Sequence, residues 1–273
     1  MKFIIISAVY NMSKDLDKNI ETLKSQNYHN FEVYFGDDMS TDNSAHLIEG
    51  LIRDDDRFHL IKHTQKHFSM KNIYRTIEYA KPNDDDIIVL VDGDDRLANE
   101  NVLALLKKTY EEKKCLMTYG SFSYNGKISR YCKPYPKLVH KTKLYRFFSW
   151  RASHLKTFKY SLWKKIPLSS LTLTKKEINR TLFSFLITLR IRSYLNCRKV
   201  KINDILTDDL KFVRRCDDKY MTLSMLEIAR EKSEFIKEEL YIYNPAGAHD
   251  FGQSDKKWAQ RLLRQAAFLK TRI

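Results

Sequence analysis

Glycine, proline and cysteine are all scarce in this chain, and each scarcity excludes a class of protein. The 273 residues include only 7 Gly, 5 Pro and 4 Cys. So little Gly and Pro excludes collagen-like and low-complexity linker proteins. The cysteines lie far apart, with no Cys-x-x-Cys pair and no histidine at metal-ligand spacing. We therefore expect neither a zinc site nor a disulfide framework, and a reducing compartment is the default.

Long apolar runs are missing as well. The run from Thr181 to Leu189 has nine residues, whereas a helix that crosses a bilayer needs about 20. The N-terminal run from Phe3 to Tyr10 follows a single lysine and has no cleavage-type tail, so it predicts a buried strand and not a secretion signal. We expect a cytoplasmic protein without a transmembrane helix, for which peripheral contact with the cytoplasmic face of a membrane stays open.

Acidic residues are almost absent from the middle of the chain. Residues 127–201 contain 20 basic side chains and one acidic one, whereas residues 1–126 carry a net charge of −5 and the whole chain +15. The excess positive charge therefore belongs to one central segment. That segment either meets an anionic partner or is solvated.

The first 120 residues alternate two kinds of apolar pattern. Continuous apolar runs at 3–9, 31–35, 58–61 and 87–91 are short enough for buried strands, and apolar residues at helical spacing lie between them. This alternation predicts an α/β fold with a mostly parallel central sheet and helices on both faces. Ligands of such sheets bind beyond the carboxyl ends of the strands.

Acidic clusters follow two of these strands. Residues 36–42 read Gly-Asp-Asp-Met-Ser-Thr-Asp, and residues 91–95 read Val-Asp-Gly-Asp-Asp. Asp37, Asp38 and Asp42 can be turn formers and helix caps, but capping explains only one of the three aspartates at 92–95. Carboxylates at one sheet edge repel each other unless a cation binds there, and no Gly-rich phosphate loop is present. The pattern indicates Mg²⁺ or Mn²⁺ bound together with a diphosphate.

These motifs resemble family 2 glycosyltransferases of the GT-A fold. The resemblance rests on Ile-Ile-Ile-Ser-Ala-Val-Tyr-Asn near the N-terminus, the residues at 36–44, Lys71-Asn72, and Val-Asp-Gly-Asp-Asp at 91–95. It covers residues 1 to about 120 and returns weakly at 151–158 and 216–227. It implies a metal-dependent enzyme that transfers sugar with inversion from a nucleotide-sugar to a hydroxyl of a glycan or glycolipid, and we expect the donor to be a UDP-sugar.

The resemblance also implies roles for individual residues in the first half. Asp38 matches the carboxylate that accepts a hydrogen bond from the nucleotide base, with Ala8 and Tyr10 lining the same pocket. Asp92 and Asp94 match the Asp-x-Asp motif, where the first aspartate lies near the ribose, together with Gly93, and the second binds the metal. Lys71 matches a basic residue near the nucleotide, although a lysine at a helix start can equally be solvated. Met39 stands where relatives have Gly, and Arg96 where many have an aromatic residue or Pro.

Fewer signals mark the second half. Asp218, in the pair Asp217-Asp218 before a helical pattern, resembles the catalytic base, with a helix cap as the alternative. His249, in a Gly-containing loop, is the candidate late histidine for the metal. Arg151 and His154, which we expect on a strand facing the cleft, are candidates for contacting acceptor or diphosphate, although a lone histidine is usually structural.

These assignments divide the chain into three parts. Residues 1–120 are the expected nucleotide-sugar-binding half. Residues 121–250 are the expected acceptor-binding half, with a basic insertion around 167–200 that matches nothing in the family. Residues 251–273 are expected to form an amphipathic basic C-terminal helix.

Three interpretations of the basic segment stay open. Residues 182–187 form an apolar patch between Arg180 and the pair Arg190 and Arg192, which suits an anionic membrane surface, and we expect Phe183, Phe185 and Ile187 to contact it. Aromatic residues among the basic ones at 131–150 would suit nucleic acid. The third interpretation is a solvated face. We favour the membrane, because the patch offers apolar as well as cationic contact, and consider nucleic acid the weaker choice.

Other activities remain alternatives to sugar transfer. A nucleotidyltransferase shares this sheet type and metal use, but is expected to carry a Gly-rich loop after the first strand, where this chain reads Ala-Val-Tyr-Asn-Met-Ser. A phosphatase of the haloacid dehalogenase type also uses Asp-x-Asp, but near its N-terminus. A non-catalytic basic adaptor that binds membrane or nucleic acid would need neither Asp94 nor Asp218.

Overall fold

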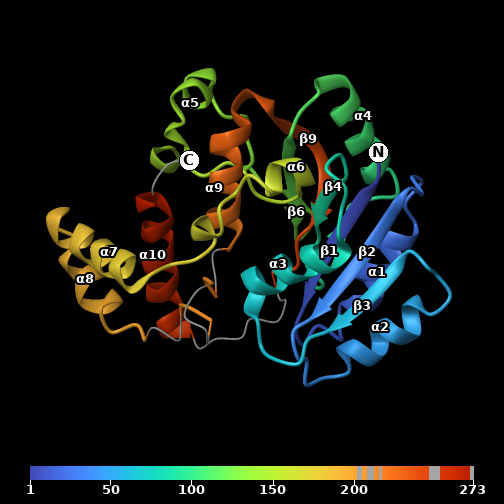
Figure 1. Ribbon diagram of the computed structural model, residues 1–273, viewed down its shortest axis with the longest axis horizontal. Helices are drawn as coiled ribbons and strands as arrows, with labels where there is room; N and C mark the ends of the chain where they lie inside the picture. Colours follow the sequence, from blue (N-terminus) through green and yellow to red (C-terminus); the bar gives the residue numbers. More distant parts are fainter. Residues whose placement is uncertain (202–204, 208–211, 215–216, 246–252, 271–273) are drawn as a thin grey trace.

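The fold was analysed in a computed structural model, which describes residues 1–201, 205–207, 212–214, 217–245 and 253–270 (Figure 1). The strands are β1 (Phe3–Val9), β2 (Phe31–Asp37), β3 (Phe58–Lys62), β4 (Ile87–Leu90), β5 (Arg96–Leu97), β6 (Met117–Tyr124), β7 (Lys127–Ile128), β8 (Lys156–Lys159) and β9 (Ser233–Ile242). The helices are α1 (Leu16–Lys24), α2 (Ser44–Ile52), α3 (Phe68–Ala80), α4 (Val102–Lys113), α5 (Lys137–Thr142), α6 (Tyr160–Trp163), α7 (Lys175–Ile187), α8 (Ile191–Cys197), α9 (Asp217–Ala229) and α10 (Gln253–Leu269). Short 3-10 helices are η1 (Leu144–Phe147), η2 (Leu168–Ser170) and η4 (Arg230–Lys232).

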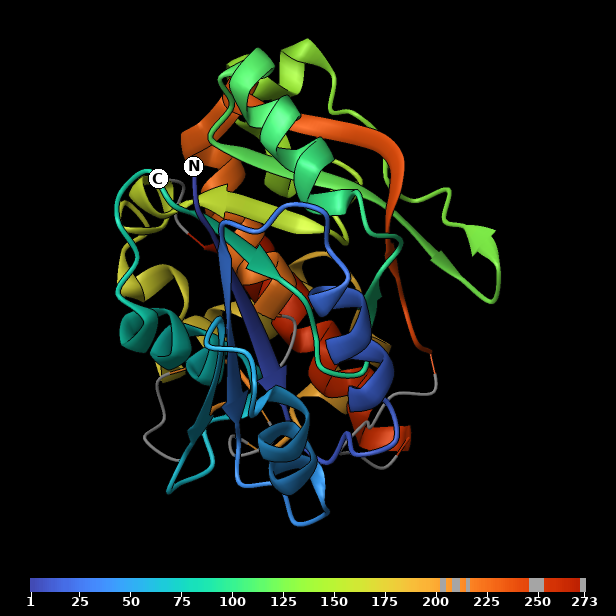
Figure 2. The same cartoon turned by 90° about the vertical axis from the view of Figure 1, so that its right-hand side faces the viewer.

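The strands form one sheet in the order β3-β2-β1-β4-β8-β6-β9-β5, with β7 paired to β6. The first four strands are parallel, as the apolar runs predicted. β8 is antiparallel to both of its neighbours, β4 and β6, and β9 is again parallel to β6. The register between β6 and β9 shifts on either side of Ser121, and β9 bends strongly around that end of the sheet (Figure 2).

Helices cover both faces of the sheet, so the predicted fold class is confirmed. Alternate residues of β1 point to opposite faces, because successive side chains of a strand alternate. Phe3 and Ile5 pack in a core cluster with residues of α1, α2 and α4. Ile4 and Ile6 pack in the other cluster with residues of α3, α9 and α10. Both clusters also include residues of β6 or β9, so the sheet and its cores run through both halves of the chain.

A buried ion pair joins the helices of the second half. Arg146 in η1 and Glu227 in α9 are both almost inaccessible, and the guanidinium donates two hydrogen bonds to the carboxylate, at 2.7 and 2.8 Å. The same guanidinium donates to the carbonyl of Ala267 in α10. Because unpaired buried charges are strongly destabilising, this pair fixes α9 against α10 and η1.

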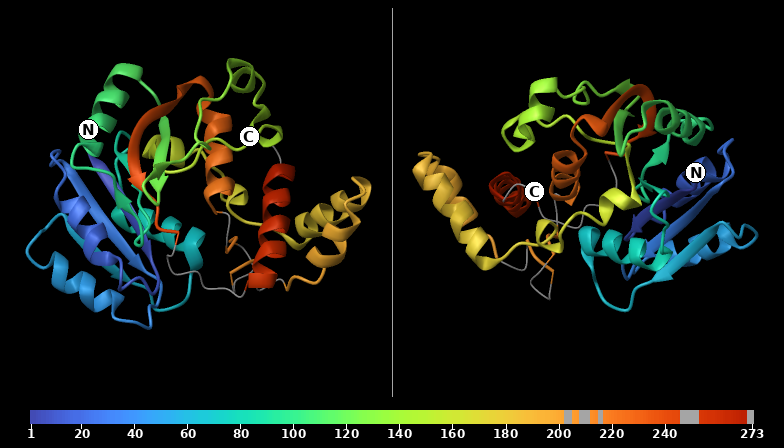
Figure 3. Two further views of the ribbon diagram at one scale, coloured as in Figure 1. Left: turned by 180° about the vertical axis from the view of Figure 1, so that it is seen from behind. Right: turned by 45° about the horizontal axis from the view of Figure 1, so that its top comes forward.

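The first turn of α9 lies toward the end of the molecule at which β1, β2 and β3 finish (Figures 1 and 3). In the described part of the chain, no helix combines the length and the apolar character that crossing a membrane requires.

Candidate active site

Three loops meet at the carboxyl ends of β1, β2 and β4, which is where the sequence predicted the site. The amide of Gly93, after β4, donates to the carbonyl of Ala8 in β1 at 3.4 Å, and the amide of Asp38, after β2, donates to Val9 at 2.9 Å. Asn11 links the first two loops, because its side-chain oxygen accepts from the amide of Thr41 at 2.8 Å and its own amide donates to Ser40 at 3.0 Å.

Two glycines permit this close approach. A Cβ on Gly93 would lie 2.9 Å from both Met12 Sδ and Val9 Cγ2, so a side chain there would push the loop after β4 away from β1. A Cβ on Gly36 would lie 2.2 Å from the side-chain oxygen of Asn72 in α3. Asn72 instead donates to the carbonyl of Gly36 at 2.7 Å and holds α3 against β2.

The carboxylates after β2 accept from backbone amides, as the alternative of turn formers predicted, whereas the N-cap residue of α2 is Asn43 and not an aspartate. Asp42 accepts from the amides of Ser13 and Ser44, and Asp37 accepts from the amide of Ser40 at 3.2 Å. Asp38 accepts at one oxygen from His67 at 2.6 Å and at the other from Phe68 at 2.8 Å, where α3 begins. A carboxylate can accept about four hydrogen bonds, so these contacts leave room for a ligand.

One oxygen of this cluster has no donor among the described residues. Asp37 Oδ1 is buried at the end of β2 without a hydrogen-bond partner. A buried acceptor without a partner is costly, because it has lost its contacts with water. The acceptor without a partner therefore belongs to Asp37, the neighbour of the Asp38 that the family resemblance selected.

Lysines approach the same loop. The ammonium of Lys66 lies over the ring of Tyr10 and 3.7 Å from an oxygen of Asp38. Lys71, in α3, is buried, so the alternative of a fully solvated lysine is wrong. Tyr10 itself is partly buried beside them.

A second cluster forms after β4. Asp92, Asp95 and His154 each offer one ligand atom, and these atoms lie within 4.8 Å of one another. His154 precedes β8 in an irregular segment and not on the strand that we expected. We call Asp92, Asp95 and His154 the acidic site. Two carboxylates and an imidazole suit a divalent cation such as Mn²⁺, which accepts both oxygen and nitrogen ligands.

Tyr241, buried in β9, contacts all three members of the acidic site. Its hydroxyl donates to Asp95 Oδ2 at 2.6 Å and accepts from the amide of Asp92 at 3.1 Å. Its ring stacks on His154, with 4.8 Å between ring centroids and 9° between planes. The other oxygen of Asp95 accepts from the amide of Asn244 at 2.7 Å. The chain thus orients the site from a strand that is far away in sequence.

Burial and mutual repulsion perturb the charges at this edge. Burial, with a contribution from Asp15, raises the pKa of Asp94 to about 6. Burial and the nearby Asp94 raise the pKa of Asp95 to about 7. Burial and then the charge of Lys156 hold the pKa of His154 well below its usual value, so the imidazole is neutral and able to bind a metal.

Lys156 in β8 adds a buried cation to this edge. Its side chain is only 5% exposed, and its charge lowers the pKa of Asp95 as well as that of His154. Lys156 therefore places positive charge near the acidic site without being exposed to solvent.

Other residues selected from the sequence lie in different surroundings. Arg151 donates to the carbonyl of Pro134 at 2.6 Å, and its guanidinium lies 4.8 Å from the centre of the Phe148 ring. Asp218 is partly exposed in the first turn of α9. His249 lies outside the described residues. The metal role of Asp94 stays a prediction, because the cluster that the structure brings together contains Asp95.

Sequence reasoning missed Tyr241, Asn244 and Lys156 and left Asp95 without a role. Asp95 had a signal, since it belongs to the acidic run after β4. Lys156 lies within residues 151–158, where the family resemblance returns. Tyr241 lies within the strand-like pattern Leu-Tyr-Ile-Tyr, and Asn244 comes directly after it. That pattern predicts a strand, but it does not show that this strand, β9, packs beside the loop after β4.

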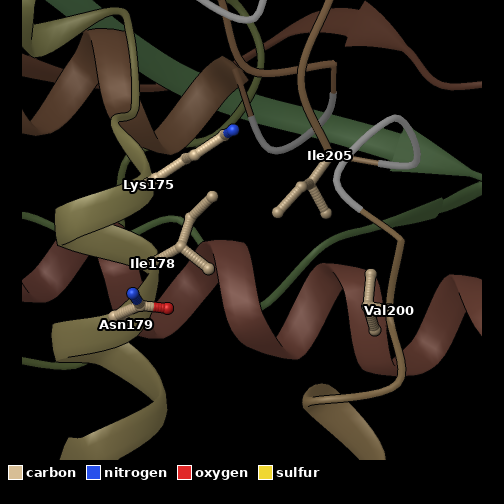
Figure 4. Close-up of a pocket in the computed structure, with 5 residues that line it drawn as sticks. All are labelled: Lys175, Ile178, Asn179, Val200 and Ile205. Carbon is tan, nitrogen blue, oxygen red and sulfur yellow. The ribbon is translucent and has the colours of Figure 1, made fainter.

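A separate cavity lies in the basic segment (Figure 4). It has a volume of about 220 Å³ and is lined by Lys175, Ile178 and Asn179 of α7 together with Val200 and Ile205. Ile178 and Ile205 face each other across it, with the Lys175 side chain beside them. Figure 1 shows α7 on the side of the molecule opposite β1–β3, so this cavity is not part of the acidic site.

Comparison with known proteins gives one family. The model of glycosyl transferase family 2 matches residues 4–183. A glycosyltransferase of Streptococcus pneumoniae, GlyG, is 29% identical over 121 residues, which are 44% of this chain and 38% of that protein. A GalNAc(5)-diNAcBac-PP-undecaprenol beta-1,3-glucosyltransferase of Campylobacter jejuni is 26% identical over 115 residues, 40% of this chain and 35% of that protein. The matched region therefore spans less than half the length of these relatives.

Solved structures extend the likeness to the whole fold. TarS residues 1–349 of Staphylococcus aureus, solved with UDP-GlcNAc, superpose with a TM-score of 0.60 over 97% of this chain and 65% of that one. The sequences are 16% identical in this comparison, so the likeness concerns the fold.

Proposed function

This chain belongs to glycosyl transferase family 2, and we propose that it transfers a sugar, with inversion, from a UDP-sugar to a hydroxyl group of a glycan or a lipid-linked acceptor. The observation that carries the proposal is the convergence of the Asp37–Asp38 loop and the acidic site at one edge of the sheet. Ligands of open α/β sheets bind at this edge.

The loops after β1 and β2 are the proposed binding site for the nucleotide. Ala8 and Tyr10 line it, and the unpaired Asp37 Oδ1 supplies an acceptor for an N–H of the base. Asp38, tied to the start of α3, supports the loop and keeps free lone pairs for the same ligand. UDP follows as the expected nucleotide because TarS, which shares the fold, was solved with UDP-GlcNAc. The ribose is proposed to lie near Asp92 and Gly93, as the family resemblance implies.

The acidic site fits a divalent cation, Mn²⁺ or Mg²⁺. Asp92, Asp95 and His154 would hold it, with Asp94 and His249 as further candidates. The raised pKa values of Asp94 and Asp95 are consistent with this, because burial, more than the neighbouring carboxylates, disfavours their charged forms, and a bound cation would favour them. When bound, the cation would neutralise the diphosphate that leaves with the nucleotide. Lys71 and Lys156 add positive charge to the same edge. Arg151 stays a candidate for contact with the diphosphate or acceptor, and His154, which the sequence also selected for that contact, is proposed for the metal instead.

Asp218 is the proposed base. Its carboxylate takes the proton of the acceptor hydroxyl, whose oxygen forms the new bond to the anomeric carbon while the bond to the diphosphate breaks. The first turn of α9 lies toward the ends of the parallel strands, which supports this role (Figure 1). The buried pair Arg146–Glu227 joins the other end of α9 to η1.

A lipid-linked acceptor is the more specific form of the proposal. It is suggested by the Campylobacter jejuni relative, whose name gives an undecaprenol-linked glycan. We also propose a cytoplasmic location, since Cys115, Cys132 and Cys197 are free and buried, as suits a reducing compartment.

The test is donor hydrolysis. UDP release should be measured from UDP-GlcNAc, UDP-glucose and UDP-galactose, with GDP-mannose as a comparison, in Mn²⁺ and in EDTA. We expect turnover of a UDP-sugar in Mn²⁺ only. If no nucleotide-sugar is hydrolysed and none raises the Tm, the proposed activity is wrong.

A pair of double variants tests the metal. Asp92→Asn with Asp95→Asn should weaken Mn²⁺-dependent UDP binding by more than about tenfold, because both oxygen ligands lose their charge. The control is Asp84→Asn with Asp85→Asn, whose carboxylates form exposed ion pairs with Lys164 and Lys159. Such surface pairs contribute about 0–1 kcal/mol, so UDP binding by the control should not change. Equal affinities in the two variants would contradict the metal assignment.

A further inference from the structure

Two helices of the basic segment form a hairpin that projects from the molecule. α7 and α8 are joined by a short turn at residues 188–190, and the turn points away from the sheet (Figures 1 and 3). We call residues 175–197 the hairpin. Both of its helices pack against α10.

One face of the hairpin is buried against α10. Phe185 is only 1% exposed, and Cys197 is equally buried, with its thiol donating to the carbonyl of Trp258 at 3.6 Å. At the base of the hairpin Glu177 pairs with Lys270 at 2.8 Å. The expectation that Phe185 contacts a membrane is therefore wrong, because α7 turns this side chain into the core.

The apolar side chains on the other face are concentrated at the turn. Phe183 is 60% exposed, Ile187 67% and Leu189 83%. Leu186, Ile191 and Leu195 are also among the exposed large apolar side chains of the described residues. Single exposed apolar residues are common, but a contiguous group at the end of a projecting element marks a contact site.

Farther from the turn, the exposed positions on the same helix faces are occupied by basic residues. Along α7, Lys176, Arg180, Phe183 and Ile187 are all exposed and follow helical spacing, so one stripe changes from basic to apolar toward the turn. Along α8 the exposed stripe runs from Ile191 and Leu195 to Arg198, again apolar near the turn and basic away from it. Arg190 and Arg192 are also exposed beside the turn, so cationic side chains flank the apolar group at the tip as well.

We propose that the hairpin docks on an anionic membrane, with the apolar side chains of its tip in the lipid interface and its basic residues, including Arg190 and Arg192 at the tip, extending to the phosphate headgroups. The distance from Phe183 to Ile187 along α7 is about 6 Å, and amphipathic elements bury their apolar faces by about 5–10 Å at this boundary. The single acidic residue of the hairpin, Glu177, lies at its far end and is paired with Lys270.

The group of exposed apolar side chains at the tip, flanked by basic ones, distinguishes a membrane from the other candidate partners. A solvated basic face has no reason to collect its apolar side chains at one tip. Nucleic acid would contact basic residues spread along a surface, with no need for aliphatic groups such as Ile187 and Leu189. The surface of a bilayer changes from charged headgroups to apolar acyl chains over about 5–10 Å, so it can contact both the basic and the apolar side chains of the tip.

Vesicle flotation tests the proposal. The probes are vesicles of phosphatidylcholine alone and of phosphatidylcholine with phosphatidylglycerol, at low and high salt and without any nucleotide-sugar. The test variant is Phe183→Ser with Ile187→Ser and Leu189→Ser. The matched control is Tyr79→Ser with Ile128→Ser and Leu138→Ser, which removes three similarly exposed apolar side chains from other parts of the surface. Circular dichroism checks that both variants stay folded.

We expect the wild type to bind the anionic vesicles and the hairpin variant to bind at least about tenfold more weakly. The control should bind within about twofold of the wild type, and high salt should weaken wild-type binding only in part, since the apolar contact persists. Wild-type protein that ignores anionic vesicles at low salt overturns the proposal. So does a hairpin variant that binds as well as the wild type.

A dimer in lipid-free buffer that the hairpin variant loses would identify a second copy of the chain as the partner, and would also overturn the proposal. Donor hydrolysis is measured separately and without vesicles. A failure of membrane docking is therefore distinguishable from a failure of the proposed activity.

Discussion

The acidic site and the hairpin hold their charges in opposite ways. Both carboxylate oxygens of Asp95 accept from defined donors, the hydroxyl of Tyr241 and the amide of Asn244. The amide of Asp92 donates to the same hydroxyl, and His154 stacks on the Tyr241 ring. The basic residues of the hairpin are exposed and spread over both helices and the turn between them. One region depends on individual atoms, whereas the other depends on the sum of many side chains.

This difference predicts how each region responds to mutation. Removing one atom from a buried, hydrogen-bonded site leaves a partner unsatisfied and has a large effect. Removing one exposed charge from a surface changes little, because the remaining charges act in the same direction. The predictions below test that contrast, beginning with the largest expected effect.

Asp218→Asn tests whether activity also depends on a single side-chain group in α9. The amide keeps the shape of the carboxylate but cannot take a proton near neutral pH, so UDP-sugar hydrolysis should fall by about 10² to 10⁴. UDP affinity, measured by calorimetry, should change little. The control Glu231→Gln removes a carboxylate from η4, beyond the far end of α9, and should retain activity. Near-normal hydrolysis in Asp218→Asn would place the base elsewhere.

The hairpin itself contains an internal comparison between two phenylalanines. Phe185→Ala should reduce the free energy of unfolding by about 3–5 kcal/mol, because it opens a cavity between α7 and α10. Phe183→Ala removes a side chain that is mostly exposed and should change it by less than about 0.5 kcal/mol. Urea denaturation of both variants checks this. Equal losses would mean that Phe183 is also packed, which would remove it from the proposed membrane contact.

The sequence predicted the first half of the fold well and the hairpin poorly. The four strands of the parallel half appeared as apolar runs, because strands buried on both faces need no polar residues. In residues 182–187 almost every residue is apolar, so periodicity could not show which side chains face inward. Only the packing of α7 on α10 separates Phe185 from Phe183, and that contact joins segments that lie far apart in the chain.

For the acidic site, the sequence predicted the region but not the individual residues that form it. The order of strands predicted that carboxylates gather after β4, since parallel strands end at one edge. Which of three neighbouring aspartates points into the cluster depends on the turn at 92–95 and on Tyr241, which lies 149 residues from Asp92. Spacing in sequence carries no information about such a partner.

Tyr241→Phe tests how far the acidic site depends on that partner. It removes one hydroxyl, which donates to Asp95 and accepts from the amide of Asp92. Outer partners of metal ligands are typically worth 10–100-fold in metal affinity, so Mn²⁺ should bind about tenfold or more weakly. Tyr110→Phe is the control, because Tyr110 is also buried but its hydroxyl bonds to Thr157. Titration with Mn²⁺ should separate the two, and equal metal affinities would mean that Tyr241 only fills space.

The smallest expected effect concerns the backbone of the loop after β2. Met39 has a φ of 61°, in the left-handed region that glycine adopts freely and other residues adopt at a cost of about 1–2 kcal/mol. Its side chain is 45% exposed, so little packing is lost in Met39→Gly. Glycine also gives the unfolded chain more freedom, which offsets part of the gain. We expect the free energy of unfolding to rise by up to about 1 kcal/mol.

Lys114→Gly is the matched control for this change. Lys114 ends α4 with a φ of 50°, away from the loop after β2, and should give a similar gain. UDP affinity should stay within about twofold of the wild type in both variants, because the contacts Asp37–Ser40 and Asn11–Thr41 fix the loop on either side of Met39. If Met39→Gly alone weakens UDP binding, Met39 stiffens the loop after β2. The proposed nucleotide site would then depend on the backbone conformation of Met39 as well as on hydrogen bonds.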